Sequence, residues 1–260
     1  MKLALNGYSI NYSDSGTGGE TILFLHGWGA PITAYRTVLS SLEQRYRVVA
    51  FDMPGVGGSS EPPVPLTIDD YIFLAENFAQ AVGIKKCILV CHSHGGRVAI
   101  GLMSKRDCPV SITKAVFIDA AGVPPKRSVG YSLRLGLYKA LRVLGTNKIT
   151  APLFGEVYEV QREKRSSADY KAASPVMRKT LSNVVSADMT PYMPNISVPV
   201  LLVWGEKDTA TPLCDAKIME SLIPGSGLAI IKGGSHFPFV ENYPQFDAVM
   251  RAFLPGGDGK

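Results

Sequence analysis

The 260-residue sequence has few cysteines and lacks a long apolar run, and each scarcity argues against a class of protein. Its four cysteines form no Cys-x-x-Cys pair and show no metal-ligand spacing, which argues against a zinc site or a disulfide-held scaffold. No stretch approaches the ~18 apolar residues of a membrane span. The first apolar run breaks at Asn6-Gly7, so no secretory signal is expected. These features together predict reduced thiols and a cytoplasmic protein.

Charged residues make up only 19% of the chain and hydrophobic residues 46%, a balance typical of a folded enzyme. The net charge of +5 is unevenly spread, because residues 122–190 hold 12 Lys and Arg against 5 Asp and Glu. That stretch carries +7, and the rest of the chain therefore carries −2. No basic recognition helix or nucleic-acid-binding module accompanies the excess, so we expect no nucleic-acid partner.

Short apolar runs alternate with stretches of helical spacing along most of the chain. The expected strands are Lys2–Leu5, Tyr8–Tyr12, Thr21–Leu25, Tyr46–Phe51, Lys86–Cys91, Ala115–Ile118, Val200–Trp204 and Gly227–Ile231. The expected helices are Ala34–Leu42, Ile68–Val82, His94–Met103, Leu213–Leu222 and Pro244–Phe253. Asn6-Gly7 is typical of a tight hairpin turn between the first two strands. The alternation predicts an α/β fold, a mostly parallel twisted sheet of about eight strands with helices on both faces.

Residues 122–194 interrupt this alternation, because they show helical periodicity and no strong strand run. We therefore expect a core domain formed by residues 1–121 and 195–260, with residues 122–194 as a helical insertion between two strands. Within the insertion, Pro175 after Ser174 is typical of a helix start.

Ser93 lies where a buried strand runs directly into a helix, in the sequence Cys91-His92-Ser93-His94-Gly95. A sharp strand-to-helix turn lifts a serine hydroxyl above the sheet, but it needs small residues two positions before and two after the serine. Gly95 meets this requirement, and Cys91, which is also small, replaces the glycine usual at the first position. The alternative is an ordinary joint in which Ser93 only caps the helix.

Five motifs in this order make the chain resemble the α/β-hydrolase superfamily of serine hydrolases with a helical cap. They are His26-Gly27-Trp28-Gly29, Asp52-Met53-Pro54-Gly55-Val56-Gly57-Gly58-Ser59, the turn around Ser93, Trp204-Gly205-Glu206-Lys207-Asp208 and Gly234-Ser235-His236-Phe237. The resemblance covers nearly the whole chain outside residues 122–190. It implies the fold of that superfamily, with residues 122–194 as the cap, or lid, over the nucleophile.

The resemblance also implies the catalytic order Ser, Asp, His. Ser93 would be the nucleophile, His236 its base and Asp208 the carboxylate that orients the histidine. Asp208 and His236 each follow an apolar run, so both would lie at the carboxyl ends of parallel strands, where such sheets place their sites. Asp119 also ends an expected strand and is the alternative acid.

The oxyanion hole implied by the resemblance consists of the backbone N–H groups of Trp28 and His94, with Gly27 and Gly29 shaping the first loop. A metal site that includes His92 and His94 is conceivable, but a tight turn is a poor place for two ligands. We therefore expect no metal and no cofactor.

These residues predict a carboxylesterase-like serine hydrolase that cleaves a small to medium ester through an acyl-enzyme. One alternative keeps the triad but cleaves a carbon–carbon bond in ring-fission products, whose carboxylates would suit a basic cap. Another is a ligand receptor on a hydrolase scaffold. The expected partner is a small molecule, and contact of the basic cap with an anionic membrane is less favoured. The sequence leaves the substrate and the oligomeric state open.

Overall fold

The computed structural model describes residues 1–125, 140–144, 146–147, 150–152, 154–157 and 173–256. Its centre is an eight-stranded sheet in the order β1-β2-β4-β3-β5-β6-β7-β8. The strands are β1 (Lys2–Leu5), β2 (Tyr8–Ser15), β3 (Thr21–Leu25), β4 (Arg47–Phe51), β5 (Lys86–His92), β6 (Ser111–Ile118), β7 (Val200–Gly205) and β8 (Ser226–Ile231). Only the pairs β1–β2 and β2–β4 are antiparallel; the other neighbours run parallel. The predicted fold class is confirmed.

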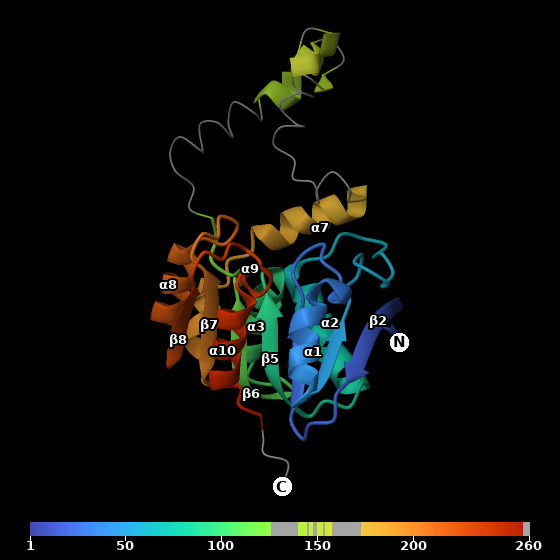
Figure 1. The fold of residues 1–260 in the computed structure, drawn as a ribbon. Helices are drawn as coiled ribbons and strands as arrows, with labels where there is room; N and C mark the ends of the chain where they lie inside the picture. The colour runs from blue at the N-terminus through green and yellow to red at the C-terminus, as the bar shows by residue number, and fades with distance from the viewer. Residues whose placement is uncertain (126–139, 145, 148–149, 153, 158–172, 257–260) are drawn as a thin grey trace.

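Helices cover both faces of this sheet (Figure 1). The named helical elements are η1 (Ile32–Tyr35), α1 (Arg36–Glu43), α2 (Ile68–Ala81), α3 (His94–Ser104), α7 (Pro175–Val185), η2 (Thr190–Asn195), α8 (Leu213–Leu222), α9 (Pro238–Glu241) and α10 (Tyr243–Phe253). Side chains of α1 and α10 pack in one hydrophobic cluster, and those of α2, α3 and α8 pack in the other. The sheet is thus the middle of three layers.

The two clusters follow from the alternation of side chains along each buried strand. In β3, Leu23 and Leu25 belong to the cluster under α2 and α3, while Ile22 and Phe24 belong to the cluster under α1 and α10. All four are at most 1% exposed. A strand buried on both faces reads as a continuous apolar run, which is why the runs in the sequence located the strands.

Local turn and cap signals also determine where elements begin. Asn6 and Gly7 have φ values of 51° and 83°, as a primed hairpin turn between β1 and β2 requires. The Ser174 side chain accepts a hydrogen bond from the Met177 N–H, and α7 begins at Pro175 as predicted. The short helices η1 and α9 were not predicted, and β6 begins at Ser111, earlier than the apolar run indicated.

Between β6 and β7, the described part of the insertion includes α7 and η2. Helix α7 lies across the edge of the sheet at which the parallel strands end (Figure 1). Thr180 Oγ1 accepts a hydrogen bond from the Leu66 N–H at 3.0 Å, and Asn183 Nδ2 donates to the Leu66 carbonyl at 3.0 Å. Residues 126–139 and 158–172, which contain most of the insertion's Lys and Arg, lie outside the described residues. The division into core and cap therefore stays a prediction.

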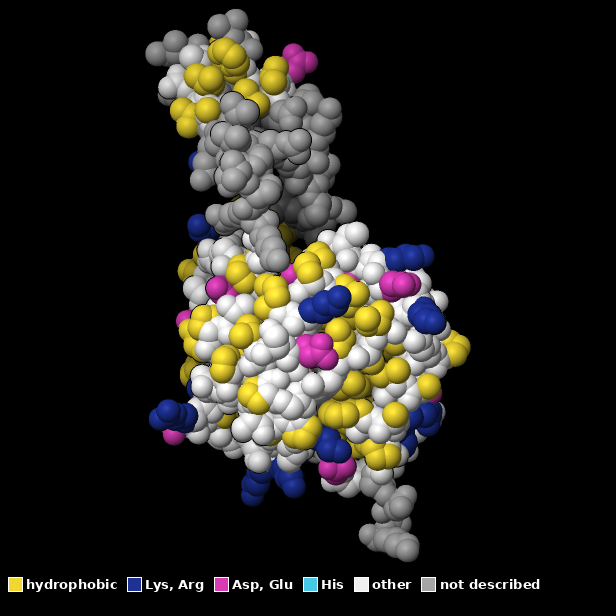
Figure 2. Space-filling view, turned by 90° about the vertical axis from the view of Figure 1, so that its left-hand side faces the viewer, with side chains coloured by type: hydrophobic (Ala, Val, Ile, Leu, Met, Phe, Trp, Pro, Cys, Tyr) yellow, Lys and Arg dark blue, Asp and Glu magenta, His cyan; other side chains and the backbone are white. Residues whose placement is uncertain are grey.

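Charges of both signs are scattered among hydrophobic side chains on the side of the molecule that carries β8 and α8 (Figure 2). Hydrophobic side chains also gather on the described part of residues 140–157, where Val143 and Val157 are 61% and 51% exposed. Within the described residues, no helix has both the length and the apolar character needed to cross a bilayer.

The Thr180 contact provides a test of how α7 is held. Thr180→Val would leave the buried Leu66 N–H without an acceptor, so we expect the free energy of unfolding to fall by about 1–3 kcal/mol. Urea denaturation measures this change. Ser182→Ala, which removes an exposed hydroxyl from the same helix, is the control and should change stability by no more than ~0.5 kcal/mol. Equal effects of the two substitutions would contradict this role of Thr180.

Candidate active site

Ser93, His236 and Asp208 meet above the carboxyl ends of three parallel strands. Ser93 follows β5, Asp208 follows β7 and His236 follows β8. His236 Nε2 lies 2.9 Å from Ser93 Oγ, and His236 Nδ1 lies 2.8 Å from Asp208 Oδ2. Residues more than 140 positions apart thus form one continuous set of hydrogen bonds.

The turn that carries Ser93 has a strained backbone, with φ 49° and ψ −117° at the serine. Its carbonyl accepts N–H bonds from Gly96 at 2.9 Å and Ala121 at 2.7 Å, which hold the turn in place. A Cβ at Gly95 would collide with the Leu25 carbonyl oxygen, so glycine is required there. The Ser93 side chain makes no cap hydrogen bond to α3. Its hydroxyl therefore faces His236 and does not cap the helix.

Cys91 lies fully buried inside β5, two residues before the turn. Burial raises the pKa of its thiol well above the ordinary value, so the sulfur stays protonated and unreactive. The position usually taken by glycine is thus filled by a small, inert side chain.

Asp208 is surrounded by hydrogen-bond donors. Its Oδ1 accepts from the N–H groups of Ala210 and Thr211 at 2.7 and 3.1 Å, and its Oδ2 accepts from Thr211 Oγ1 at 2.6 Å and from His236. Burial raises the pKa of this carboxyl, but the bonds from His236 and Thr211 outweigh burial and lower the pKa to about 2. Asp208 is therefore ionised at neutral pH.

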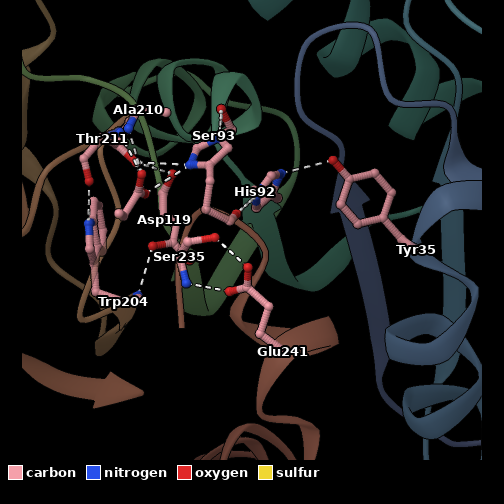
Figure 3. A network of polar contacts seen from close by, with 12 residues as sticks. Tyr35, His92, Ser93, Asp119, Trp204, Ala210, Thr211, Ser235 and Glu241 are labelled. Carbon is pink, nitrogen blue, oxygen red and sulfur yellow. Dashed lines mark hydrogen bonds and ion pairs between the residues drawn. The ribbon is translucent and has the colours of Figure 1, made fainter. Parts of the chain in front are cut away.

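Asp119, the alternative acid, interacts with the Asp208 carboxyl but has fewer hydrogen-bond donors around it. Figure 3 shows its side chain among those of the site. It is fully buried, its φ is 40°, and its Oδ1 accepts one bond, from the Gly205 N–H at 2.8 Å. No donor among the described residues reaches Oδ2. Burial, together with the nearby Asp208 carboxyl, raises the pKa of Asp119 to about 9. A protonated Asp119 can donate its proton to Asp208, whereas it makes no hydrogen bond to His236 within the described structure.

The loop after β3 positions the Trp28 N–H. His26 is buried and neutral, because burial lowers its pKa. Its Nε2 accepts from the Met53 N–H at 2.8 Å, so Nδ1 carries the proton and donates to the Gly27 carbonyl at 2.6 Å. Because that carbonyl and the Trp28 N–H share one planar peptide, the bond sets the direction of the N–H. No described turn or loop carbonyl accepts the Trp28 N–H.

Three further predicted residues fit the same loops. His94 is the first residue of α3, so its N–H has no acceptor inside the helix. Gly29 has a φ of 70°, which favours glycine. A Cβ at Gly27 would lie 2.7 Å from His92 Nδ1 and 2.9 Å from Tyr35 Oη, so these side chains leave space only for glycine.

Three residues that support the site were not predicted from the sequence to have a role there. Thr211 donates to Asp208, and its own carbonyl accepts from Trp204 Nε1 at 2.7 Å. Ser235, next to His236, donates its N–H and hydroxyl to Glu241 (Figure 3). Tyr35 contacts His92. A threonine three positions after Asp208 is a weak local signal for the first contact; the sequence carries none for Tyr35.

A pocket of about 450 Å³ opens beside Ser93. Its walls are largely apolar, with Leu181 and Val184 contributed by α7, but Arg97 also lines it. Arg97 is 7% exposed; its Nη2 donates to the Val185 carbonyl at 3.3 Å, and its Nε has no partner in the described structure. Among the described residues, no group of three His, Cys, Asp or Glu side chains is placed to hold a metal ion.

Comparisons with known proteins identify a family. The profile of the Alpha/beta hydrolase family matches residues 22–249. A pimeloyl-[acyl-carrier protein] methyl ester esterase of Aeromonas hydrophila is 24% identical over 267 residues, which cover 95% of this chain and 99% of that protein. A 2-hydroxy-6-oxononadienedioate/2-hydroxy-6-oxononatrienedioate hydrolase of Pseudomonas sp. is 25% identical over 270 residues, which cover 96% of this chain and 93% of that protein.

A solved structure has the same fold. The enol-lactonase from Burkholderia xenovorans LB400 superposes with a TM-score of 0.74 at 18% identity, covering 98% of this chain and all of that one. The family profile spans most of the chain and includes the segments that carry Ser93, Asp208 and His236. The chain therefore belongs to the Alpha/beta hydrolase family.

Proposed function

We propose that this protein is a serine hydrolase that cleaves a carboxylic ester through an acyl-enzyme. Ser93 is the nucleophile, His236 the general base and Asp208 the orienting carboxylate. The observation that carries the proposal is the pair of hydrogen bonds of His236, 2.9 Å to Ser93 Oγ and 2.8 Å to Asp208 Oδ2. A nucleophile within reach of a base that is itself oriented by a third group is the arrangement required for acyl transfer.

In the first half of the reaction, Ser93 Oγ attacks the ester carbonyl while His236 Nε2 takes its proton. His236 then gives that proton to the leaving alcohol. Water attacks the acyl-enzyme in the second half, and the same histidine removes and returns a proton. The ionised Asp208 keeps the Nδ1–H tautomer of His236 and stabilises the imidazolium that forms.

The Trp28 and His94 N–H groups are the proposed oxyanion hole. The carbonyl oxygen, as it becomes negatively charged, would accept a hydrogen bond from each of them. Each such donor contributes about 10²–10³ in rate. The first turn of α3 adds the positive end of its dipole at the same place.

Residues 122–194 are proposed as the cap over this site. The part that supports this proposal is α7, because Leu181, Val184 and Val185 line the pocket beside Ser93. An apolar wall of this kind suits the hydrocarbon part of an acyl group.

A specific observation favours a second candidate, hydrolysis of a carbon–carbon bond in a dienoate ketone by the same triad. Arg97 is a buried cation at the pocket wall whose Nε lacks a partner in the described structure. A substrate carboxylate would satisfy that group with a charge-assisted hydrogen bond. The 2-hydroxy-6-oxononadienedioate hydrolase among the relatives acts, as its name says, on a dicarboxylate.

Labelling of Ser93 tests the central proposal. A fluorophosphonate probe should label the protein and fail to label Ser93→Ala, because the probe traps an activated serine. Short p-nitrophenyl esters should be hydrolysed with a loss of about 10⁶ in kcat on Ser93→Ala or His236→Ala. The double variant should lose no more than either single variant, since the two residues act as a unit. Labelling without turnover of any substrate would instead support the ligand receptor.

Replacing each of the two acids separates their roles in catalysis. Asp208→Asn should lower kcat by about 10⁴, because an amide favours the wrong tautomer of His236. Asp119→Asn should change kcat by less than about tenfold, because asparagine imitates a carboxyl that is already neutral. Ester hydrolysis at neutral pH measures both changes. A larger loss of kcat for Asp119→Asn than for Asp208→Asn would make Asp119 the carboxylate that orients His236.

The same variant tests the protonation of Asp119. In the unfolded chain an aspartate releases its proton near pH 3.9, whereas the folded protein holds this proton up to about pH 9. The folded state therefore binds the extra proton, so the contribution of Asp119 to the free energy of unfolding should fall as pH rises from 5 to 8. Asp119→Asn removes this loss, so its stability relative to the wild type should increase with pH. Parallel pH profiles in urea denaturation would contradict the raised pKa.

Matched substrates test Arg97. We expect Arg97→Gln to reduce kcat/KM for mono-p-nitrophenyl glutarate about tenfold more than for p-nitrophenyl pentanoate, because only the first carries a terminal carboxylate. The two acyl chains have the same length, so pocket size is controlled. Equal losses would remove the carboxylate from the proposal and leave the esterase. Turnover of a dienoate diketone, with no ester cleaved, would favour the second candidate.

A further inference from the structure

A buried chain of hydrogen bonds connects the loops of the proposed site. The Gly27 N–H donates to Tyr35 Oη at 2.9 Å, Tyr35 Oη lies 2.8 Å from His92 Nδ1, and His92 Nε2 lies 2.8 Å from the carbonyl oxygen of His236. Figure 3 shows the Tyr35 hydroxyl pointing at the His92 ring. This chain of hydrogen bonds thus runs from the loop after β3, through the end of β5, to the loop after β8.

Each contact lies on or beside a group with a role in the proposed mechanism. Gly27 precedes Trp28, and His92 precedes Ser93. At the third contact the chain reaches the backbone of His236 itself. The hydrogen bonds therefore link the proposed oxyanion loop, nucleophile and base without using the side chain of any of them.

The chemistry of the partners determines the position of every proton. A carbonyl oxygen only accepts, so His92 Nε2 must carry a hydrogen and donate to His236. Burial, and the nearby His236, lower the pKa of His92 to about 3, so its ring is neutral and Nδ1 is an acceptor. Tyr35 must then donate its hydroxyl hydrogen to Nδ1, and its oxygen is left to accept the Gly27 N–H. Every polar group in this chain of hydrogen bonds therefore has a partner, and each bond donates toward His236.

The surroundings strengthen these bonds. Tyr35 and His92 are each 1% exposed. The Tyr35 ring packs against Phe24 and Phe239 with centroid distances of 4.9 and 5.6 Å, and the His92 ring lies 5.1 Å from that of Phe237. Hydrogen bonds in so apolar a site are electrostatically stronger than in water, and bonds in series polarise one another. Removal of one member leaves the next group buried and unpaired.

We propose that Tyr35 and His92 are positioning residues, which hold the backbone of His236 at the distance from Ser93 that proton transfer requires. The inference rests on the proposed function. Asp208 holds the ring of His236 at Nδ1, while the Tyr35–His92 pair holds its main chain at the carbonyl oxygen. Tyr35 also selects the His92 tautomer, because the other tautomer would turn a lone pair of Nε2 toward the His236 carbonyl.

Tyr35→Phe removes only the hydroxyl oxygen and so tests the chain of hydrogen bonds directly. We expect kcat for a p-nitrophenyl ester to fall about 10- to 100-fold with KM within about twofold, since a small displacement of the base affects proton transfer more than binding. The rate of fluorophosphonate labelling should fall in parallel. Tyr35→Phe with an unchanged kcat and labelling rate would overturn the inference.

Tyr46→Phe is the matched control. Tyr46 is also 1% exposed, and its hydroxyl also accepts a backbone N–H, from Gly256 at 2.8 Å, but within the described structure it makes no hydrogen bond to the loops of the site. Removal of the Tyr46 hydroxyl should therefore affect the stability of the protein about as much as removal of the Tyr35 hydroxyl. It should leave kcat within about twofold of the wild type. Equal losses of kcat in the two variants would assign the effect of Tyr35 to stability alone.

Two substitutions of His92 test the last bond. Glutamine carries an N–H able to reach the His236 carbonyl, whereas methionine fills similar space without a donor. We expect His92→Gln to keep a kcat several-fold above that of His92→Met, measured well below the melting temperature of both. Equal activities would show that the donor to His236 is unimportant.

The tautomer gives a readout that needs no substrate. The chain has only four histidines, so long-range proton–nitrogen NMR spectra can be assigned by single substitutions. His92 should remain in the neutral Nε2–H form from pH 5 to 8 in the wild type. An Nδ1–H tautomer, or protonation within that range, would overturn the inference even if Ser93 is labelled. Absence of labelling with the expected tautomer would instead contradict the proposed function.

Discussion

The rest of the site depends on the tight backbone turn at Ser93. Its φ of 49° and ψ of −117° are sparsely populated for a serine and cost of order 1–3 kcal/mol. The fold maintains this turn because its neighbours leave no room to relax: the Leu25 carbonyl lies against Gly95 on one side, and the Ser93 carbonyl accepts the Ala121 N–H on the other. Leu25 ends β3 and Ala121 follows β6, and these two strands are the neighbours of β5. The sheet itself therefore holds the hydroxyl where His236 can reach it.

Electrostatics in this site are decided by the number of donors around each group. Asp119 and Asp208 are adjacent carboxyls in a buried place, yet their pKa values differ widely, about 9 and about 2. Burial raises both values. Hydrogen bonds from His236 and Thr211 outweigh it for Asp208, whereas Asp119, among the described residues, accepts a hydrogen bond from Gly205 alone and keeps its proton. The protein thus places one negative charge beside His236, and the neutral Asp119 supports it without repelling it.

Two neutral histidines also hold the backbone of the site in place. His26 and His92 are each buried, and burial lowers the pKa of both. A neutral imidazole has one donor and one acceptor, so two fixed partners impose a single tautomer and a single ring orientation. His26 uses these bonds to orient the Gly27 carbonyl, and His92 uses them on the His236 carbonyl. Two peptide groups near Ser93 are in this way held by side chains that carry no charge.

The sequence by itself determined the strands, most helices and the turn at Ser93, because these depend on local periodicity and on small residues at fixed spacing. Order along the chain also brought Asp208 and His236 forward as candidates. Both Asp119 and Asp208 follow buried strands; the motif Trp204–Asp208 favoured Asp208, but only the tertiary structure placed its carboxylate against His236. It also revealed Tyr35, whose partner His92 lies 57 positions away. Contacts over such separations depend on the strand order, in which β4 lies outside β3, and no local pattern records that order.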